Sequence, residues 1–303
     1  REEMSDIEIS LGGFDEKLFH WAQRLIVSPG VAVAEPLIVD AQQRGVEVIG
    51  DIEIFAREVR APIVAITGSN GKSTVTSLLA QMAEDAGRKV RMGGNIGTPV
   101  LELLEQDEAD FYVLELSSFQ LETTYSLHAA AAVVLNVSPD HMDRYRDLEH
   151  YAASKQRIFA DGDLSADAVA VINRDDACVA AMPVGQHRTI SFGLGEPHAG
   201  QFGRIKKDNQ FWLARGEEAL MPVSQMRMAG EHAQANALAA LALGESMGLP
   251  MESMLATLTH FSGLPHRTQF VAEADGVTWI NDSKGTNVGA TISAVQGLDG
   301  PLI

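Results

Sequence analysis

The sequence predicts an α/β protein built on a central, mostly parallel sheet with a phosphate-binding loop at one edge. Short apolar runs alternate with helical patterns along the chain, which is typical of parallel sheets. A glycine-rich segment that ends in Lys-Ser lies between one such run and the helix after it. At 303 residues the chain is too long for one ordinary core, so we expect two or three domains.

The predicted elements follow one another in a regular order. A buried strand over 62–66 leads into a helix over 72–86 whose apolar residues share one face, and Gly87 lies where a helix cap belongs. Further strands are predicted at 111–116, 130–137, 168–172 and 277–281, and further helices at 147–159, 233–247, 251–261 and from 287. Short, hairpin-like pieces are expected over 189–220 with a turn at Asp208-Asn209, and another hairpin at Asp275-Gly276.

Changes in pattern near residues 50 and 263 suggest two boundaries. Gly263-Leu264-Pro265 has the composition of a linker. We therefore predict domains at 1–50, 51–263 and 264–303.

The composition restricts the possible partners and compartments. A net charge of −18 gives no general attraction for nucleic acid or anionic lipid, so any bound phosphate must be held locally. A single cysteine, Cys178, forms no disulfide within the chain, which fits a reducing compartment, and we expect it to be buried in a helix. No apolar run is long enough to cross a bilayer, so we expect a cytoplasmic protein without membrane insertion.

The segment Thr67-Gly68-Ser69-Asn70-Gly71-Lys72-Ser73-Thr74 carries the sharpest local signal. Glycines let backbone N–H groups converge on phosphate oxygens, and the following helix directs its positive end at the same anion. The lysine reaches terminal phosphates and the serine offers a hydroxyl to Mg²⁺. Ile66 stands where the general phosphate-loop pattern has glycine, so only a shorter Gly-x-x-Gly-Lys-Ser form is met. The alternative is a glycine-rich turn without a ligand.

Polar residues follow two other predicted strands. Glu115 ends an apolar strand, where it either meets solvent or holds Mg²⁺ beside the loop. Asp140, His141 and Asp143 gather after the next strand, although acidic residues there also cap turns and a lone histidine is usually structural. Judged on its residue type and helix alone, Lys155 is predicted to be an ordinary surface lysine.

Six short segments, in order and spacing, resemble the Mur ligase family over essentially the whole chain. They are residues 68–74, Gly94-Asn95-Ile96-Gly97, Leu114 to Leu121, Asp140 to Tyr145, Leu264-Pro265-His266-Arg267 and Asn281-Asp282-Ser283-Lys284. The resemblance implies a three-domain architecture with a central P-loop-type sheet, a partial first domain and a partial Rossmann-like third domain. Within the family, the third, fourth and last segments are most similar to the branch that adds D-glutamate to UDP-N-acetylmuramoyl-L-alanine.

The resemblance also implies roles for individual residues, with ATP and Mg²⁺ as cofactors. It assigns ATP to Gly68, Ser69, Asn70, Gly71, Lys72, Ser73, Thr74, Asn236, Arg267, Asp282 and Lys284. It assigns Mg²⁺ to Ser73, Glu115, His141 and a carbamate on Lys155, with catalysis by Lys72, Glu115, His141 and Lys155. It assigns the acceptor to Ser28, Gly30, Asn95, Ser117 and His141, and D-glutamate to Thr286. Ala233 replaces a usual asparagine and Gly285 a usual alanine.

The expected reaction joins D-glutamate to the acceptor through an acyl phosphate and forms ADP and phosphate, in a bacterial enzyme that we expect to be monomeric. We also expect the start of the first domain and most of the third to be missing from this sequence. Two alternatives stay open. One is a sibling Mur or folylpolyglutamate-type ligase, and the other is a non-catalytic module that binds ATP.

Overall fold

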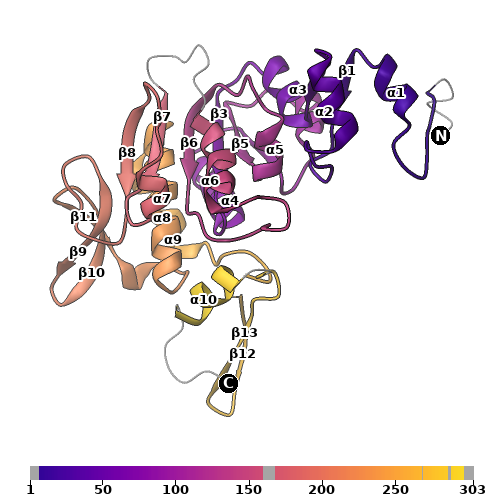
Figure 1. Cartoon of the computed structure of the whole chain (residues 1–303). Coiled ribbons are helices and arrows are strands. Elements are labelled where there is room, and N and C mark those ends of the chain that lie inside the picture. Colours follow the sequence, from indigo (N-terminus) through magenta and orange to yellow (C-terminus); the bar gives the residue numbers. More distant parts are fainter. Residues whose placement is uncertain (1–6, 160–167, 268, 286–287, 297–303) are drawn as a thin grey trace.

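The computed structural model describes residues 7–159, 168–267, 269–285 and 288–296. Its centre is a 9-stranded sheet with the order β11-β10-β9-β8-β7-β6-β3-β5-β4 (Figure 1). The strands are β3 (Ile63–Thr67), β4 (Val90–Gly94), β5 (Phe111–Glu115), β6 (Ala129–Val134), β7 (Val169–Asn173), β8 (Arg188–Phe192), β9 (Phe202–Lys207), β10 (Gln210–Arg215) and β11 (Glu218–Pro222). Pairing is parallel from β4 through β9, and β9, β10 and β11 pair antiparallel.

Helices cover both faces of this sheet. One face packs against α4 (Lys72–Asp85), α8 (Glu231–Ser246) and α9 (Met251–His260). The other packs against α3 (Asp51–Glu58), η1 (Val100–Glu105), α5 (Ser118–Glu122), α6 (Leu148–Gln156), η2 (Arg157–Phe159) and α7 (Ala177–Ala180). Two hydrophobic cores result, and the sheet lies between them.

The apolar character of the central strands follows from this double burial. In β3, Val64 and Ile66 enter the core beneath α4, while Ile63 and Ala65 enter the opposite core. Side chains alternate between the two faces of a strand, so a strand covered on both faces must be apolar throughout.

Two smaller pieces flank the central sheet on different sides (Figure 1). The first contains α1 (Glu16–Trp21), β1 (Arg24–Ile26), α2 (Pro36–Gln43) and β2 (Glu47–Ile49), with β1 and β2 parallel. It has a small core of its own around Val27, Ile38 and Val48. The second contains the antiparallel hairpin β12 (Gln269–Ala274) and β13 (Val277–Asn281), followed by α10 (Val288–Gln296). In the central part, a short 3₁₀ helix, η3 (Val223–Gln225), lies between β11 and α8.

The predicted α/β class with a large, mostly parallel sheet is confirmed, and so are the hairpin turns. Asp208, Asn209 and Asp275 all adopt a positive φ in those turns, as short polar residues tolerate. Two expectations are wrong: β8 pairs in parallel with β7 instead of forming a hairpin, and Cys178 lies on α7 but is exposed. The division of the chain at residues 50 and 263 stays a prediction. In the described part of the chain no helix is both long and apolar enough to span a membrane.

Candidate functional site

The site forms where three neighbouring strands end. β3 lies between β5 and β6 and is parallel to both, so their carboxyl ends meet at one edge of the sheet. The glycine-rich loop follows β3, Glu115 is the last residue of β5, and Asn136 comes shortly after β6. Segments that are distant in the sequence are therefore brought to one place by the strand order.

Two glycines give the loop its shape. Gly68 has a φ of 155° and Gly71 a φ of 84°, in the region that favours glycine. Gly71 is also the N-cap of α4, so the loop leads directly into the helix N-terminus. A Cβ added at Gly71 would lie 2.5 Å from Oδ1 of Asn236, which comes from α8. A side chain at this position would therefore displace the Asn236 amide from its place beside the loop.

Asn136 holds the loop in this conformation. Its backbone oxygen accepts from the N–H of Ser69 at 2.9 Å, and its Oδ1 accepts from the N–H of Asn70 at 2.8 Å. Its Nδ2 donates to the Asn70 oxygen at 3.0 Å. No role was predicted for Asn136, which lies within the strand predicted at 130–137, whereas β6 ends at Val134.

Two lysines converge on a single carbonyl of the loop. The Gly68 oxygen accepts a hydrogen bond from Lys72 Nζ at 2.9 Å and another from Lys155 Nζ at 3.0 Å. Burial lowers the pKa of Lys72, and Arg267 lowers it further, against the opposing effects of Glu115 and Asp140. Burial also lowers the pKa of Lys155 well below its ordinary value, and repulsion from Lys72 adds to this. Lys155 is 1% exposed, so the prediction of a surface lysine is wrong.

Glu115 is buried beside the loop with one oxygen paired. It is 2% exposed, and its Oε1 accepts from Asn95 Nδ2 at 2.7 Å. Within the described residues, Oε2 has no hydrogen-bond partner. A buried carboxylate oxygen without a partner is costly, so this atom has the character of a ligand for a cation. The alternative of a Glu115 that meets solvent is excluded, and its role as a Mg²⁺ ligand stays a prediction.

His141 lies next to this cluster on a strained turn. Its φ of 54° is unusual for a residue other than glycine. Its ring packs against Phe119, with centroids 4.8 Å apart, and lies 6.5 Å from the ring of Tyr151. The Tyr151 hydroxyl is hydrogen-bonded to Ser69 of the loop at 3.3 Å. His141 is therefore adjacent to the loop, with its imidazole partly open to solvent.

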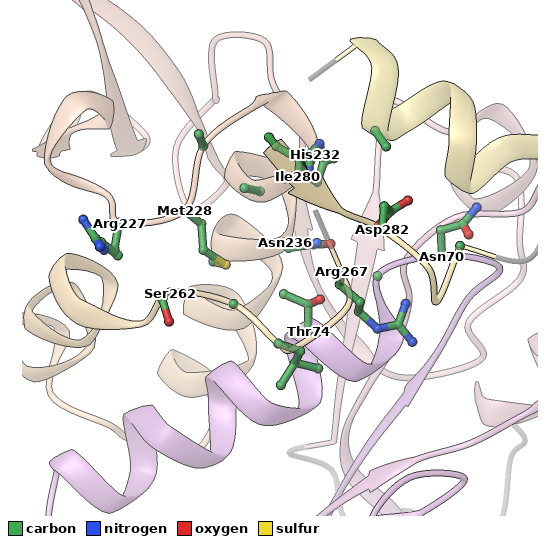
Figure 2. A pocket seen from close by; sticks show the side chains of 18 of the residues that line it. Asn70, Thr74, Arg227, Met228, His232, Asn236, Ser262, Arg267, Ile280 and Asp282 are labelled. Carbon is green, nitrogen blue, oxygen red and sulfur yellow. The ribbon is translucent and has the colours of Figure 1, made fainter. Parts of the chain in front are cut away.

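A cavity of about 580 Å³ opens beside the loop (Figure 2). Figure 2 shows Thr74 of α4, Asn236 and His232 of α8, and Asp282 of the C-terminal piece around it. Arg267, which precedes β12, contacts the start of α4 directly, because its Nη2 donates to Ser73 Oγ at 2.9 Å. Among the residues with predicted ATP roles, Asn70, Gly71, Thr74, Asn236, Arg267 and Asp282 line the cavity. The cavity is also lined by residues for which no role was predicted: Asn136, Arg227, His232, Ser262 and Ile280.

Other predicted site residues lie apart from this cavity. The Lys284 side chain is exposed, and its backbone N–H donates to His266 at 3.1 Å. Ser28 and Gly30 are exposed in the first piece. Ser117 is the N-cap of α5, where its hydroxyl accepts from the Gln120 N–H at 3.1 Å. Thr286 lies outside the described residues.

The residues present fit a magnesium ion only in part. Glu115 Oε2 and the Ser73 hydroxyl are hard oxygen donors of the kind that Mg²⁺ prefers. Across the described ranges, no three His, Cys, Asp or Glu side chains come together as a metal centre. The predicted set contains one carboxylate and one imidazole, so a lysine that remains an amine cannot complete it.

Two segments of the chain match known protein domains, and the chain as a whole is similar to curated proteins. Residues 66–244 match the Mur ligase middle domain, and residues 2–50 match the N-terminal domain of MurD-like Mur ligases. The UDP-N-acetylmuramoylalanine–D-glutamate ligase of Nitrosococcus oceani is 54% identical over 98% of this chain and 65% of its own length. That of Pseudomonas putida is 49% identical over 98% of this chain and 65% of its own length. The chain thus spans about two thirds of the length of these curated relatives.

Solved structures show the same fold at low sequence identity. MurF from Acinetobacter baumannii superposes with a TM-score of 0.67 at 22% identity, covering 80% of this chain and 55% of that one. A pseudomurein peptide ligase type C from Methanothermus fervidus gives a TM-score of 0.64 at 20% identity, covering 95% of this chain and 67% of that one.

The mostly parallel sheet, the glycine-rich loop at its edge and the lysines Lys72 and Lys155 at that loop define an α/β protein with a phosphate-binding type of loop. The two domain matches then identify the chain as a member of the Mur ligase family.

Proposed function

We propose that this chain carries the central part of an ATP-dependent ligase that joins D-glutamate to UDP-N-acetylmuramoyl-L-alanine in peptidoglycan precursor synthesis. Relatives named for this activity are 47–54% identical to the chain, which supports the proposal. The observation that carries it is the convergence of Lys72 and Lys155 on the Gly68 carbonyl, beside the buried Glu115. A buried lysine, Lys155, at the phosphate loop beside a buried carboxylate supports chemistry on the phosphates in addition to nucleotide binding.

The loop and Lys72 would hold the ATP phosphates in this reaction. A carboxylate does not react with an amine at neutral pH, and phosphorylation converts it into an acyl phosphate that does. Negative charge spreads over the phosphoryl oxygens during transfer, and fixed cations and backbone N–H groups stabilise it. Arg267 already reaches the loop through Ser73, which supports its assignment to a phosphate. Asn236 and Asp282 line the adjoining cavity, where we place the adenosine.

Ser73, Glu115, His141 and Lys155 would hold Mg²⁺ if Lys155 is carbamylated. Carbamylation requires a neutral amine, and burial lowers the pKa of Lys155 well below its ordinary value. The carbamate would replace a cation by an oxygen donor. Bound Mg²⁺ would supply charge neutralisation and orientation of the phosphates. Asn95, which donates to Glu115 Oε1, would keep that carboxylate in place.

The acceptor would be held by the first piece and by loops of the central sheet, and D-glutamate would approach from the C-terminal piece. Ser28, Gly30, Asn95, Ser117 and His141 are proposed for the acceptor, Thr286 for D-glutamate and Lys284 for the nucleotide. We place the enzyme in the bacterial cytoplasm as a monomer, which sedimentation of the protein would test. A non-catalytic ATP-binding module is the second candidate, favoured only by the large cavity at the nucleotide side.

The test is ADP release by the chain extended to the full length of its relatives, supplied with acceptor and a panel of amino acids. We expect release that requires both the acceptor and D-glutamate. Release with another amino acid indicates a sibling ligase, and ATP binding without any release indicates the module. Lys72→Ala should abolish release while leaving the circular dichroism spectrum unchanged. Substantial activity in that variant would refute the phosphate-loop assignment.

A further inference from the structure

Arg144 connects the first piece of the chain to the central sheet. Its Nη1 donates to the Pro29 oxygen at 2.9 Å, and its Nη2 donates to the Val31 oxygen at 3.1 Å. The same Nη2 donates to Glu122 Oε2 of α5 at 2.9 Å. Both partners of this ion pair are largely buried, with side-chain exposures of 14% and 13%. One guanidinium thus fixes the loop at 28–31 against the end of α5.

The same side chain is coupled to His141. The Arg144 guanidinium lies over the Phe119 ring at 4.1 Å from its centroid, and the His141 ring packs against Phe119 with centroids 4.8 Å apart. The backbone N–H of Arg144 also donates to the backbone oxygen of His141 at 2.9 Å, which closes the turn in which His141 has its positive φ. A shift of Arg144 would therefore reach His141 through the backbone and through Phe119.

This arrangement requires an arginine. A guanidinium is planar and directs donors at several acceptors while its face stacks on an aromatic ring. A lysine has a compact ammonium that cannot make the same contacts at once. Removing one partner of a buried pair also leaves the other, here Glu122, without its charge partner.

We propose that Arg144 is a positioning residue that couples the docking of the loop at 28–31 to the placement of His141. The inference deepens the proposed function, in which that loop approaches the acceptor and His141 faces its reacting end. Acceptor binding at the first domain and the geometry of the strained turn would then depend on each other.

The test compares Arg144→Met and Arg144→Lys with Arg146→Lys in the chain extended to the length of its relatives. Arg146 is the matched control because its side chain is 81% exposed and pairs only with its neighbour Asp147 among the contacts described. We expect both Arg144 variants to raise the acceptor KM and to lower kcat by about tenfold or more, with the ATP KM changed less than about twofold. Arg146→Lys should match the parent.

Hydrogen exchange of the 303-residue chain provides a readout that does not depend on activity. Amides at 28–31 and at 141–145 should both exchange faster in Arg144→Lys than in the parent, while those of β3 stay unchanged. If Arg144→Met fails to fold, Glu122→Gln replaces it and should show the same pattern in milder form. Equal increases in the acceptor and ATP KM, or faster exchange at only one of the two segments, would overturn the proposal. If the parent releases no ADP at all, the proposed function fails, and hydrogen exchange at the two segments would still test whether Arg144 couples them.

Discussion

Gly71 and Gly87 begin and end the same helix, α4, and together they test how the phosphate loop is built. Both have a positive φ, 84° and 76°, so alanine at either position carries the same backbone penalty of about 1–2 kcal/mol. Their surroundings differ. A Cβ at Gly87 meets nothing within 4 Å, whereas one at Gly71 lies 2.5 Å from Asn236 Oδ1.

The magnitude for Gly71→Ala follows from that distance. Ordinary contact begins at 3.4 Å, so the Asn236 amide must retreat by about 0.9 Å. Asn236 lines the cavity assigned to adenosine, and displacements of about 1 Å in a binding site lower activity by up to about a hundredfold. We therefore expect Gly71→Ala to weaken ATP binding by at least tenfold, about 1.4 kcal/mol, and Gly87→Ala to leave it unchanged.

The assay is calorimetric titration of the 303-residue chain and both variants with ATP, alongside thermal unfolding. Both variants should unfold at a lower temperature than the parent, Gly71→Ala by the larger amount. If the two variants lose ATP affinity equally, or Gly71→Ala loses none, the close approach of α8 to the loop does not control nucleotide binding.

Further predictions concern three buried residues, Lys155, Glu53 and Ala233. Because burial lowers the pKa of Lys155, the unfolded chain binds a proton that the folded chain lacks between the folded pKa and 10.5. The free energy of unfolding should therefore fall by at most about 1.4 kcal/mol per pH unit as the pH drops through that range, and denaturant titrations of Lys155→Met should lack this slope. The ligase activity of Lys155→Ala should be partly restored by acetate. Burial raises the pKa of Glu53, but hydrogen bonds from Ser126, Tyr125 and Arg57 outweigh it and hold that pKa below its ordinary value. Glu53→Gln weakens these charge-assisted hydrogen bonds and should cost about 1.5–3 kcal/mol at neutral pH, and urea titrations should show the difference shrinking as acid protonates the parent carboxylate. Ala233 is buried and lines the cavity, at a position where the family usually has asparagine. If that asparagine contacts adenine, Ala233→Asn should tighten ATP binding severalfold in the same calorimetric assay, and unchanged affinity would speak against the contact.

The predicted elements were largely recoverable because their signals are local. The strand at 62–66 and the helix at 72–86 match β3 and α4 to within a residue or two, since double burial makes the strand apolar throughout and amphipathic spacing marks the helix. Strand β4 was missed because the alternation in its sequence, Val-Arg-Met-Gly-Gly, extends over only three residues before two glycines end it. The parallel pairing of β8 was missed because this short strand directly precedes the hairpins, although the connection over 174–187 is long enough for a crossover.

The sequence by itself determined the loop, its helix and the family, because the loop and helix depend on adjacent residues and the family on short segments whose order along the chain is visible without the fold. Only the tertiary structure decided the environment of Lys155 and Glu115, which have the residue types of surface groups and yet are almost fully buried. It also decided that Lys72 and Lys155 meet at the Gly68 carbonyl and that Arg144 joins the loop at 28–31 to Phe119. The physical reason is that the order of strands in the sheet sets which strand ends become neighbours, and the solvation and protonation of a side chain depend on those neighbours.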